Sequence, residues 1–247
     1  MEENKKEAGI MISEIGFSNF PVLLKSAGLD FFILDCEHGG FDYADISRML
    51  MTARLIGLTA VVRVADNSRK DLIKFADMGA GGVLLPMTDC AEDIEKVVRF
   101  TKYSPLGRRG ISTMRAHTLY SPPEIGRYMR EANGRFRVYA QLETAAGVKN
   151  AAEILAVDGV DGCFVGPNDL SDDYGCLENT AAPQIFMAIQ EVGAAARTAK
   201  KTAGIITGNK IYMSAAKKNG FEMYCKGSEL NAVKEYCVAI VRTLQEE

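Results

Sequence analysis

Eight short apolar runs alternate with longer amphipathic segments along the chain, and this alternation limits the possible folds more than any other feature. The runs are GIMIS (9–13), DFFILD (30–35), AVVRV (60–64), GVLLP (82–86), VYAQLE (138–143), GCFVG (162–166), AGIIT (203–207) and FEMYCK (221–226). Short runs of this kind are typical of buried strands, and the segments between them carry apolar residues at helical spacing. Eight strands alternating with helices over 247 residues predict an α/β fold of the (β/α)₈ TIM-barrel type.

An open, doubly wound sheet is the main alternative, because a count of strands does not exclude it. No G-x-G-x-x-G follows the first run, so the dinucleotide-binding version loses its main support. No internal repeat, low-complexity tract or linker interrupts the pattern, and we expect one domain over residues 1–247. The one long excursion, residues 104–123, is rich in Gly, Pro and Arg. Loops of this length are usually functional or mobile.

Charge and cysteine usage argue against several classes of function. The net charge is −3 and no long basic run occurs, which gives no electrostatic support for a nucleic-acid or membrane-surface partner. The N-terminus is polar, unlike a signal peptide, and no run of about 18 apolar residues could span a membrane. The six cysteines are scattered without a C-x-x-C pair, which suits reduced thiols in the cytoplasm better than a zinc site.

Polar and ionisable side chains gather where the predicted strands end. This group consists of Asp35, Glu37, His38, Arg63, Gln141, Glu143, Asn168 and Asp169. The carboxyl ends of barrel strands form the face that holds active sites, so we expect these side chains to share one rim. Any one of them alone would be read as a solvated loop charge, but several on one rim favour a functional site.

Glu143 and Asp169 are the most informative pair within this group. They end sequential strands, and neighbouring strands lie about 4.8 Å apart. Two carboxylates so placed can share a cation, and oxygen ligands without cysteine or a second histidine favour Mg²⁺ or Mn²⁺ over structural zinc. The alternative is that each carboxylate caps the helix that follows it, which suits Asp169 in particular.

His38 and Arg63 are the candidate proton-transfer and charge-stabilising groups. His38 can act as a general acid or base near neutral pH, although a hydrogen-bonded structural histidine is the simpler alternative. Arg63 is a charge inside a buried run, so it needs an anionic partner: Asp35, Asp66 or a developing oxyanion. The other histidine, His117, lies in the long loop and is expected at the surface.

The motifs DCEHG, VVRV, DMGAGGVLLPM, SPLGRRG, QLETAAGVKN and VDGVDGCFVGPNDLSDDYG resemble, in order and spacing, the HpcH/HpaI aldolase family. The resemblance covers nearly all of the chain. It implies a TIM barrel and a metal-dependent, class II pyruvate aldolase that cleaves a 4-hydroxy-2-oxo acid reversibly to pyruvate and an aldehyde. The implied cofactor is Mg²⁺ or Mn²⁺, with Co²⁺ as a further candidate.

The resemblance also implies roles for individual residues. His38 matches the family's base, and Arg63 matches the group that stabilises the enolate. Asp77 matches an acid that raises the basicity of the histidine. The helix that carries Asp77 should end at the opposite face of the barrel. Its role would therefore require an unusual helix position, a solvent link or a site completed by another subunit.

The binding positions transfer in the same way. Glu143 and Asp169 match the metal ligands of the family. Gln141, Gly166, Asn168 and Asp169 match positions that bind the substrate. The long loop and the strand-eight end KGSELN (226–231) are expected to contact the aldehyde, whose identity the sequence does not reveal.

The resemblance further implies a homo-oligomer, a hexamer built as a trimer of dimers, with a C-terminal helix exchanged between subunits. The tail supports this through an apolar stripe at helical spacing. The stripe is formed by Ala232, Val233, Tyr236, Cys237, Ile240 and Val241. In the alternative arrangement, the same helix covers its own barrel.

Three other functions stay open. One is a different carbon–carbon lyase or decarboxylase on the same barrel, such as an acyl-CoA ester lyase, against which His38 argues. A second is a Schiff-base aldolase that uses Lys226, at the end of the eighth run. The third is a non-catalytic barrel that binds a keto acid.

Overall fold

The computed structural model describes residues 6–121 and 124–245, which contain eight parallel strands closed into a barrel. The strands are β1 (Glu7–Ile12), β2 (Phe31–Asp35), β3 (Thr59–Arg63), β4 (Gly82–Leu85), β5 (Arg137–Leu142), β6 (Gly162–Val165), β7 (Thr202–Ile206) and β8 (Met223–Ser228). Each strand pairs with its neighbours in the chain, and β8 pairs with β1. All eight apolar runs therefore form strands, and the closed order excludes the open, doubly wound sheet.

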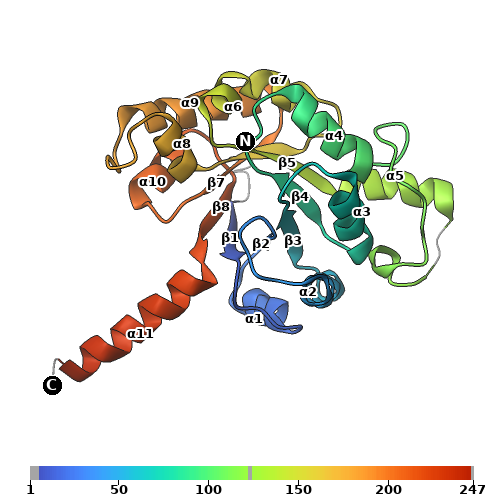
Figure 1. Ribbon diagram of the computed structural model, residues 1–247, viewed down its shortest axis with the longest axis horizontal. Coiled ribbons are helices and arrows are strands. Elements are labelled where there is room, and N and C mark those ends of the chain that lie inside the picture. The colour runs from blue at the N-terminus through green and yellow to red at the C-terminus, as the bar shows by residue number, and fades with distance from the viewer. Residues whose placement is uncertain (1–5, 122–123, 246–247) are drawn as a thin grey trace.

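Helices connect the strands, and apart from the last one they surround the barrel (Figure 1). They are α1 (Phe20–Ser26), α2 (Tyr43–Ile56), α3 (Arg69–Met78), α4 (Ala91–Thr101), the short 3₁₀ helix η1 (Ala116–Thr118), α5 (Ile125–Arg135), α6 (Ala145–Lys149), α7 (Ala151–Ala156), α8 (Pro167–Asp173), α9 (Pro183–Ala199), α10 (Lys210–Lys218) and α11 (Glu229–Gln245). Two of them, α2 and α3, end at Gly57 and Gly79 with left-handed φ angles of 67° and 97°, which glycine adopts without strain. Within residues 6–121 and 124–245, no helix combines the length and hydropathy that a membrane crossing requires.

Successive residues of each strand face opposite sides of the sheet, and this separates two apolar cores. Phe31 and Ile33 of β2 point into the barrel, where they pack with Val61, Leu84 and Phe164 in a fully buried cluster. These side chains fill the barrel, so its interior is a packed core rather than a channel.

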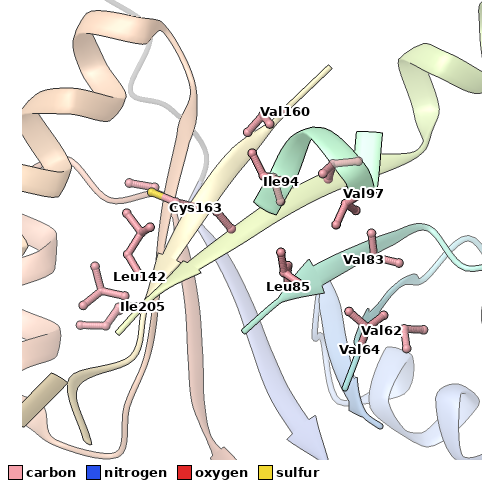
Figure 2. Packing of buried hydrophobic residues seen from close by; sticks show 14 of the residues in the cluster. Val62, Val64, Val83, Leu85, Ile94, Val97, Leu142, Val160, Cys163 and Ile205 are labelled. Carbon is pink, nitrogen blue, oxygen red and sulfur yellow. The ribbon is translucent and has the colours of Figure 1, made fainter. Parts of the chain in front are cut away.

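The alternate positions form the second core, between the barrel and its helices. Figure 2 shows part of this layer, where Ile94 and Val97 of α4 lie beside Val83 and Leu85 of β4. Strands β2, β4 and β6 are buried on both faces, so they appear in the sequence as continuous apolar runs without a polar alternation.

Helix α11 leaves the barrel instead of covering it (Figure 1). From Leu230 onward its described residues are exposed, including the apolar stripe, so the arrangement in which the helix covers its own barrel is excluded. Only its first residue, Glu229, is buried. The Oε1 atom of Glu229 accepts hydrogen bonds from the backbone N–H groups of Ser13, Glu14 and Ile15 at 2.9, 2.7 and 3.0 Å. This carboxylate fixes the start of α11 to the loop after β1.

The long loop lies at the opposite end of the barrel from the strand carboxyl ends. It follows α4 and leads through α5 to the start of β5, and its Ala116 and His117 pack against Gly79 at the end of α3. We call the end of the barrel where the carboxyl ends of the strands meet its mouth. Within one chain, the described part of this loop is therefore remote from the mouth. The expectation that the loop contacts the aldehyde is wrong for its own barrel.

The expectation that His117 lies at the surface is also wrong, since only 4% of the residue is exposed. Its Nε2 atom donates to the backbone carbonyl of Ser112 at 2.9 Å, and its Nδ1 atom accepts from the hydroxyl of Tyr128. Buried polar groups require hydrogen-bond partners, and these two bonds satisfy both ring nitrogens.

Candidate active site

The alternation that fills the barrel with apolar side chains also places polar ones at its mouth. On β2 the next inward position after Phe31 and Ile33 is Asp35, and on β3 Arg63 follows Val61. Asp35 and Arg63 are also register partners on adjacent strands, which brings their side chains together. The charged pair therefore follows from the pleat of the two strands.

Asp35 and Arg63 form a buried, bidentate ion pair. Arg63 Nε donates to Oδ1 at 2.9 Å and Nη2 donates to Oδ2 at 2.7 Å. Burial opposes the ionisation of Asp35, but the hydrogen bond and charge of Arg63 outweigh it and hold the pKa of Asp35 below its usual value. The other candidate partner of Arg63, Asp66, instead accepts a hydrogen bond from the backbone of Ser68 at 2.7 Å.

Asp35 also holds the turn that presents the neighbouring polar residues. Its Oδ1 atom accepts from the backbone N–H groups of Glu37 and His38 at 3.1 and 3.3 Å. Glu37 Oε2 lies 3.2 Å from Arg63 Nη1 and 3.8 Å from His38 Nε2. The His38 side chain is 74% exposed, so it reaches the open mouth, unlike a buried structural histidine. Gly39 is required here, because a Cβ atom would lie 2.1 Å from the Asp35 carbonyl oxygen.

Glu143 lies on the opposite side of the mouth, beyond the end of β5, and is 2% exposed. Its Oε1 atom accepts from the backbone N–H of Met87 at 2.8 Å, and its Oε2 atom accepts from the side-chain amide of Gln141. Met87 takes a left-handed φ of 47°, which is uncommon for a residue with a side chain. Gly166 lets the carboxylate approach, since a Cβ atom there would lie 2.6 Å from Glu143 Oε2.

The mouth has excess negative charge around Glu143. Burial raises the pKa of Glu143 to about 7; the Met87 N–H acts in the opposite direction, and the charges of Asp169 and Glu37 raise the pKa further. Asp169 lies in the first turn of α8 and is exposed. A divalent cation between the two carboxylates would relieve this repulsion.

The donor set suits an oxygen-liganded cation with open positions. Among the described residues, no group of three or more His, Cys, Asp or Glu side chains is arranged to hold a metal. Two carboxylates would leave the other positions to water or to a chelating substrate, as Mg²⁺ and Mn²⁺ commonly allow. The side-chain Oε1 atom of Gln141 is buried without a hydrogen-bond partner and can accept from a ligand in the same place.

The raised pKa of Glu143 leads to a prediction for pH dependence. In the folded, metal-free protein Glu143 keeps its proton up to a pKa of about 7, against an ordinary value of 4.5, so the folded state binds more protons between these values. The contribution of Glu143 to the free energy of unfolding must therefore decrease as pH rises from about 4.5 to about 7. The Glu143→Gln variant is expected to lack this decrease.

Urea unfolding of both proteins in a chelator between pH 4 and 8 would measure the difference. Added Mn²⁺ should restore stability to the wild type at pH 8 and do little for the variant. If the wild type and the variant differ by the same free energy of unfolding at every pH, Glu143 ionises at its ordinary pKa.

Asp77 is the predicted site residue that the structure does not bring to the mouth. It lies near the end of α3, where its Oδ1 atom accepts from Arg109 Nη2 at 2.6 Å and lies 3.7 Å from His117 Nε2. Within one chain, Asp77 and His38 are at opposite ends of the barrel.

Two residues at the mouth, Asp35 and Glu37, have positioning and electrostatic roles that the sequence alone does not reveal. Asp35 positions both Arg63 and the turn that carries His38, and Glu37 lies close enough to affect the pKa of Glu143. The inward alternation from Phe31 through Ile33 could have identified Asp35. The position of Glu37 depends on the turn after β2, which no periodicity fixes.

Known proteins resemble this chain in sequence and in fold. Residues 23–233 match the family described as HpcH/HpaI aldolase/citrate lyase. A 4-hydroxy-2-oxo-heptane-1,7-dioate aldolase from Klebsiella pneumoniae is 35% identical over 190 residues, which cover 76% of this chain and 71% of the relative. A 5-keto-4-deoxy-D-glucarate aldolase from the same organism is 33% identical over 184 residues, or 74% and 71% of the two chains. The crystal structure of an HpcH/HpaI aldolase from Desulfitobacterium hafniense has a TM-score of 0.93 at 30% identity and covers 98% of this chain and 94% of that one.

These matches agree with the barrel fold. The relatives are aldolases, which are carbon–carbon lyases, and the match to each extends over more than two thirds of both chains. The family match spans the strands from β2 to β8 and therefore includes every predicted site residue. The chain belongs to the HpcH/HpaI aldolase/citrate lyase family and is a carbon–carbon lyase that cleaves a hydroxy-oxo acid.

Proposed function

We propose that this protein is a metal-dependent aldolase that reversibly cleaves a 4-hydroxy-2-oxo acid to pyruvate and an aldehyde. One observation carries the proposal. The carboxylates of Glu143 and Asp169 lie close enough for one charge to raise the pKa of the other, at a mouth that also holds a buried Arg63 and an exposed His38. This combination provides a cation site, a fixed positive charge and a proton acceptor within one opening.

Glu143 and Asp169 would hold a divalent cation, with Mg²⁺ or Mn²⁺ favoured by the oxygen ligands and Co²⁺ as a further candidate. When bound, such a cation supplies Lewis-acid polarisation of the keto oxygen of the substrate. The amide of Gln141 and the backbone around Asn168 and Asp169 would contact the keto acid. Gly166 has no Cβ atom, which leaves room for the Glu143 carboxylate to lie against this backbone.

Arg63 would stabilise the enolate of pyruvate that forms when the carbon–carbon bond breaks. Its guanidinium is fixed by the bidentate contact with Asp35, so it needs no rearrangement as negative charge develops on the enolate oxygen. His38 would accept the proton of the aldol hydroxyl during cleavage and return it during synthesis. The exposure of His38 lets it reach a substrate in the mouth directly or through one water.

The competing functions have less support. A Schiff-base lysine is usually activated by desolvation, and Lys226 at the end of β8 is exposed. The acyl-CoA lyase and the non-catalytic keto-acid binder do not account for His38 at the mouth.

The end of strand eight stays a prediction for contact with the aldehyde. Lys226 and Ser228 line a cavity of about 530 Å³ that also reaches Asn168.

The proposed half-reaction can be tested without knowing the aldehyde. An enzyme that enolises pyruvate should exchange the methyl protons of pyruvate with deuterium, as measured by proton NMR in D₂O. The exchange should stop with a chelator and return with Mg²⁺ or Mn²⁺, and borohydride with pyruvate should not inactivate the protein. Exchange that persists without metal, or borohydride trapping of a lysine adduct, would assign the protein to the Schiff-base class.

We further propose a cytoplasmic homo-oligomer in which α11 packs against another copy. The six cysteines are free thiols, which supports the predicted compartment. The projecting helix exposes Val233, Tyr236, Ile240, Val241 and Leu244, and exposed apolar stripes of this kind usually mark an interface.

Light scattering should therefore give a mass that is a multiple of 26.9 kDa, with a hexamer as the expected value. Changing Tyr236 and Ile240 together to aspartate should lower the mass by placing charges on the apolar stripe. Lys234→Asp, on an exposed polar position of the same helix, should leave the mass unchanged. A wild-type mass of one chain would reject the oligomer.

A further inference from the structure

Three arginines surround a small cavity at the end of the barrel opposite the candidate active site. The cavity has a volume of about 60 Å³, and its walls include Arg54 near the end of α2, Arg109 of the long loop, and Arg135 at the end of α5. Arg54 and Arg135 shortly precede β3 and β5, at the amino ends of these strands. A strand of five residues is roughly 17 Å long, so this cavity is well separated from Arg63 at the mouth.

Two of these guanidinium groups have buried donors without acceptors. Arg109 is 6% exposed, and its Nη2 atom donates a hydrogen bond to Asp77. Its Nε atom is buried and has no hydrogen-bond partner. The Nε atom of Arg54 is buried and unpartnered in the same way. Unpaired buried donors of charged groups are unfavourable, and native structures seldom keep them without a ligand or water.

Positive charge around the cavity exceeds the negative charge. Burial lowers the pKa of Arg54; the phenol of Tyr128 acts in the opposite direction, and the charges of Arg135 and Arg109 lower the pKa further. The acid near Arg135 is Glu131 at 4.0 Å, which is also bonded to Arg127 at 2.7 Å.

The other polar groups in the wall are already satisfied. His117 donates through Nε2 to the Ser112 carbonyl, so its Nδ1 atom is an acceptor and takes the proton of the Tyr128 hydroxyl. Burial lowers the pKa of His117, and the charge of Arg109 acts in the same direction, which favours this neutral form. The donors left for a ligand are therefore the N–H groups of the arginines.

We propose that this cavity binds a small oxyanion, a phosphate or a carboxylate, through Arg54, Arg109 and Arg135. The planar guanidinium fork matches two oxygens of such an anion, and charged donors form the stronger kind of hydrogen bond. A volume of about 60 Å³ accepts an ion of a few atoms and excludes a nucleotide. The exposed side chain of Arg135, with 58% of its surface accessible, provides the way in.

Thermal unfolding of the full-length, metal-free protein in a chelator tests this proposal with inorganic phosphate as the probe. Phosphate at about ten times its dissociation constant should raise the melting temperature by about 2–4 °C over sodium chloride of equal ionic strength. Arg54→Gln and Arg135→Gln should each abolish this rise. Without phosphate, Arg54→Gln should melt at a higher temperature than the wild type, because it removes one of three repelling charges.

The matched control is Arg48→Gln on the same helix α2, where Arg48 is exposed and paired with Asp45. This variant should keep the full phosphate effect. Acetate in place of phosphate distinguishes the two ligand classes, since a rise with acetate alone assigns the site to carboxylates. A phosphate effect no larger than that of chloride, or one that both cavity variants retain, would overturn the proposal.

Discussion

Replacing Glu143 or Asp169 with alanine is expected to lower aldol cleavage by about 10³-fold or more and to abolish binding of Mn²⁺. The Lewis-acid effect of a bound metal contributes several kcal/mol to the transition state, and each 1.36 kcal/mol corresponds to about tenfold in rate. Isothermal titration with Mn²⁺ and steady-state kinetics measure the two effects.

The matched control for this pair is Asp172→Ala. Asp172 lies one turn after Asp169 on α8 and is exposed, so its loss should change neither metal binding nor rate. Glu143→Ala also removes the acceptor of the Met87 N–H group, and a melting curve would show whether the fold survives. Metal binding that survives removal of both carboxylates would require a different cation site.

Changing His38 to alanine is expected to lower the rate of aldol cleavage by about 10²–10⁴-fold, the usual contribution of a general base. The substrate hydroxyl would then have no positioned acceptor for its proton. Stability should be almost unchanged, because the His38 side chain is 74% exposed and its nearest charged contact is Glu37 at 3.8 Å. Kinetics and urea unfolding of the same sample separate the two effects.

Mn²⁺ binding should also be retained in this variant, since His38 is not a proposed ligand. A rate within about tenfold of the wild type would show that another group, or water alone, takes the hydroxyl proton. A loss of Mn²⁺ binding instead would place His38 among the metal ligands.

The features that local periodicity controls could be predicted from the sequence. Each apolar run became a strand because burial on both faces leaves a continuous apolar segment, and the glycines that follow helices became left-handed caps. The mouth could also be predicted, since parallel barrel strands all end at one face. The alternation within a strand then turns Gln141 and Glu143 inward after Tyr139.

The features that depend on distant parts of the chain could not be predicted in this way. Whether Arg63 pairs with Asp35 or Asp66 depends on the register between strands. The burial of His117 depends on contacts with Tyr128, from a helix whose position is set by the whole loop. The direction of α11 depends on the hydrogen bonds that Glu229 accepts from backbone N–H groups after β1, such as that of Ser13.

The contact between Glu229 and the loop after β1 has a consequence for the order of events during synthesis. Ser13 and Glu229 are 216 residues apart, and they lie next to the seam where β8 joins β1. At a translation rate of about 5–20 residues per second, the ribosome needs about 10–40 s to make the intervening segment. During that interval β1 presents an unpaired edge, which is a template for association with other nascent chains. The seam should therefore be the last part of the barrel to form, and nascent chains that stop before β8 should be the most prone to aggregate.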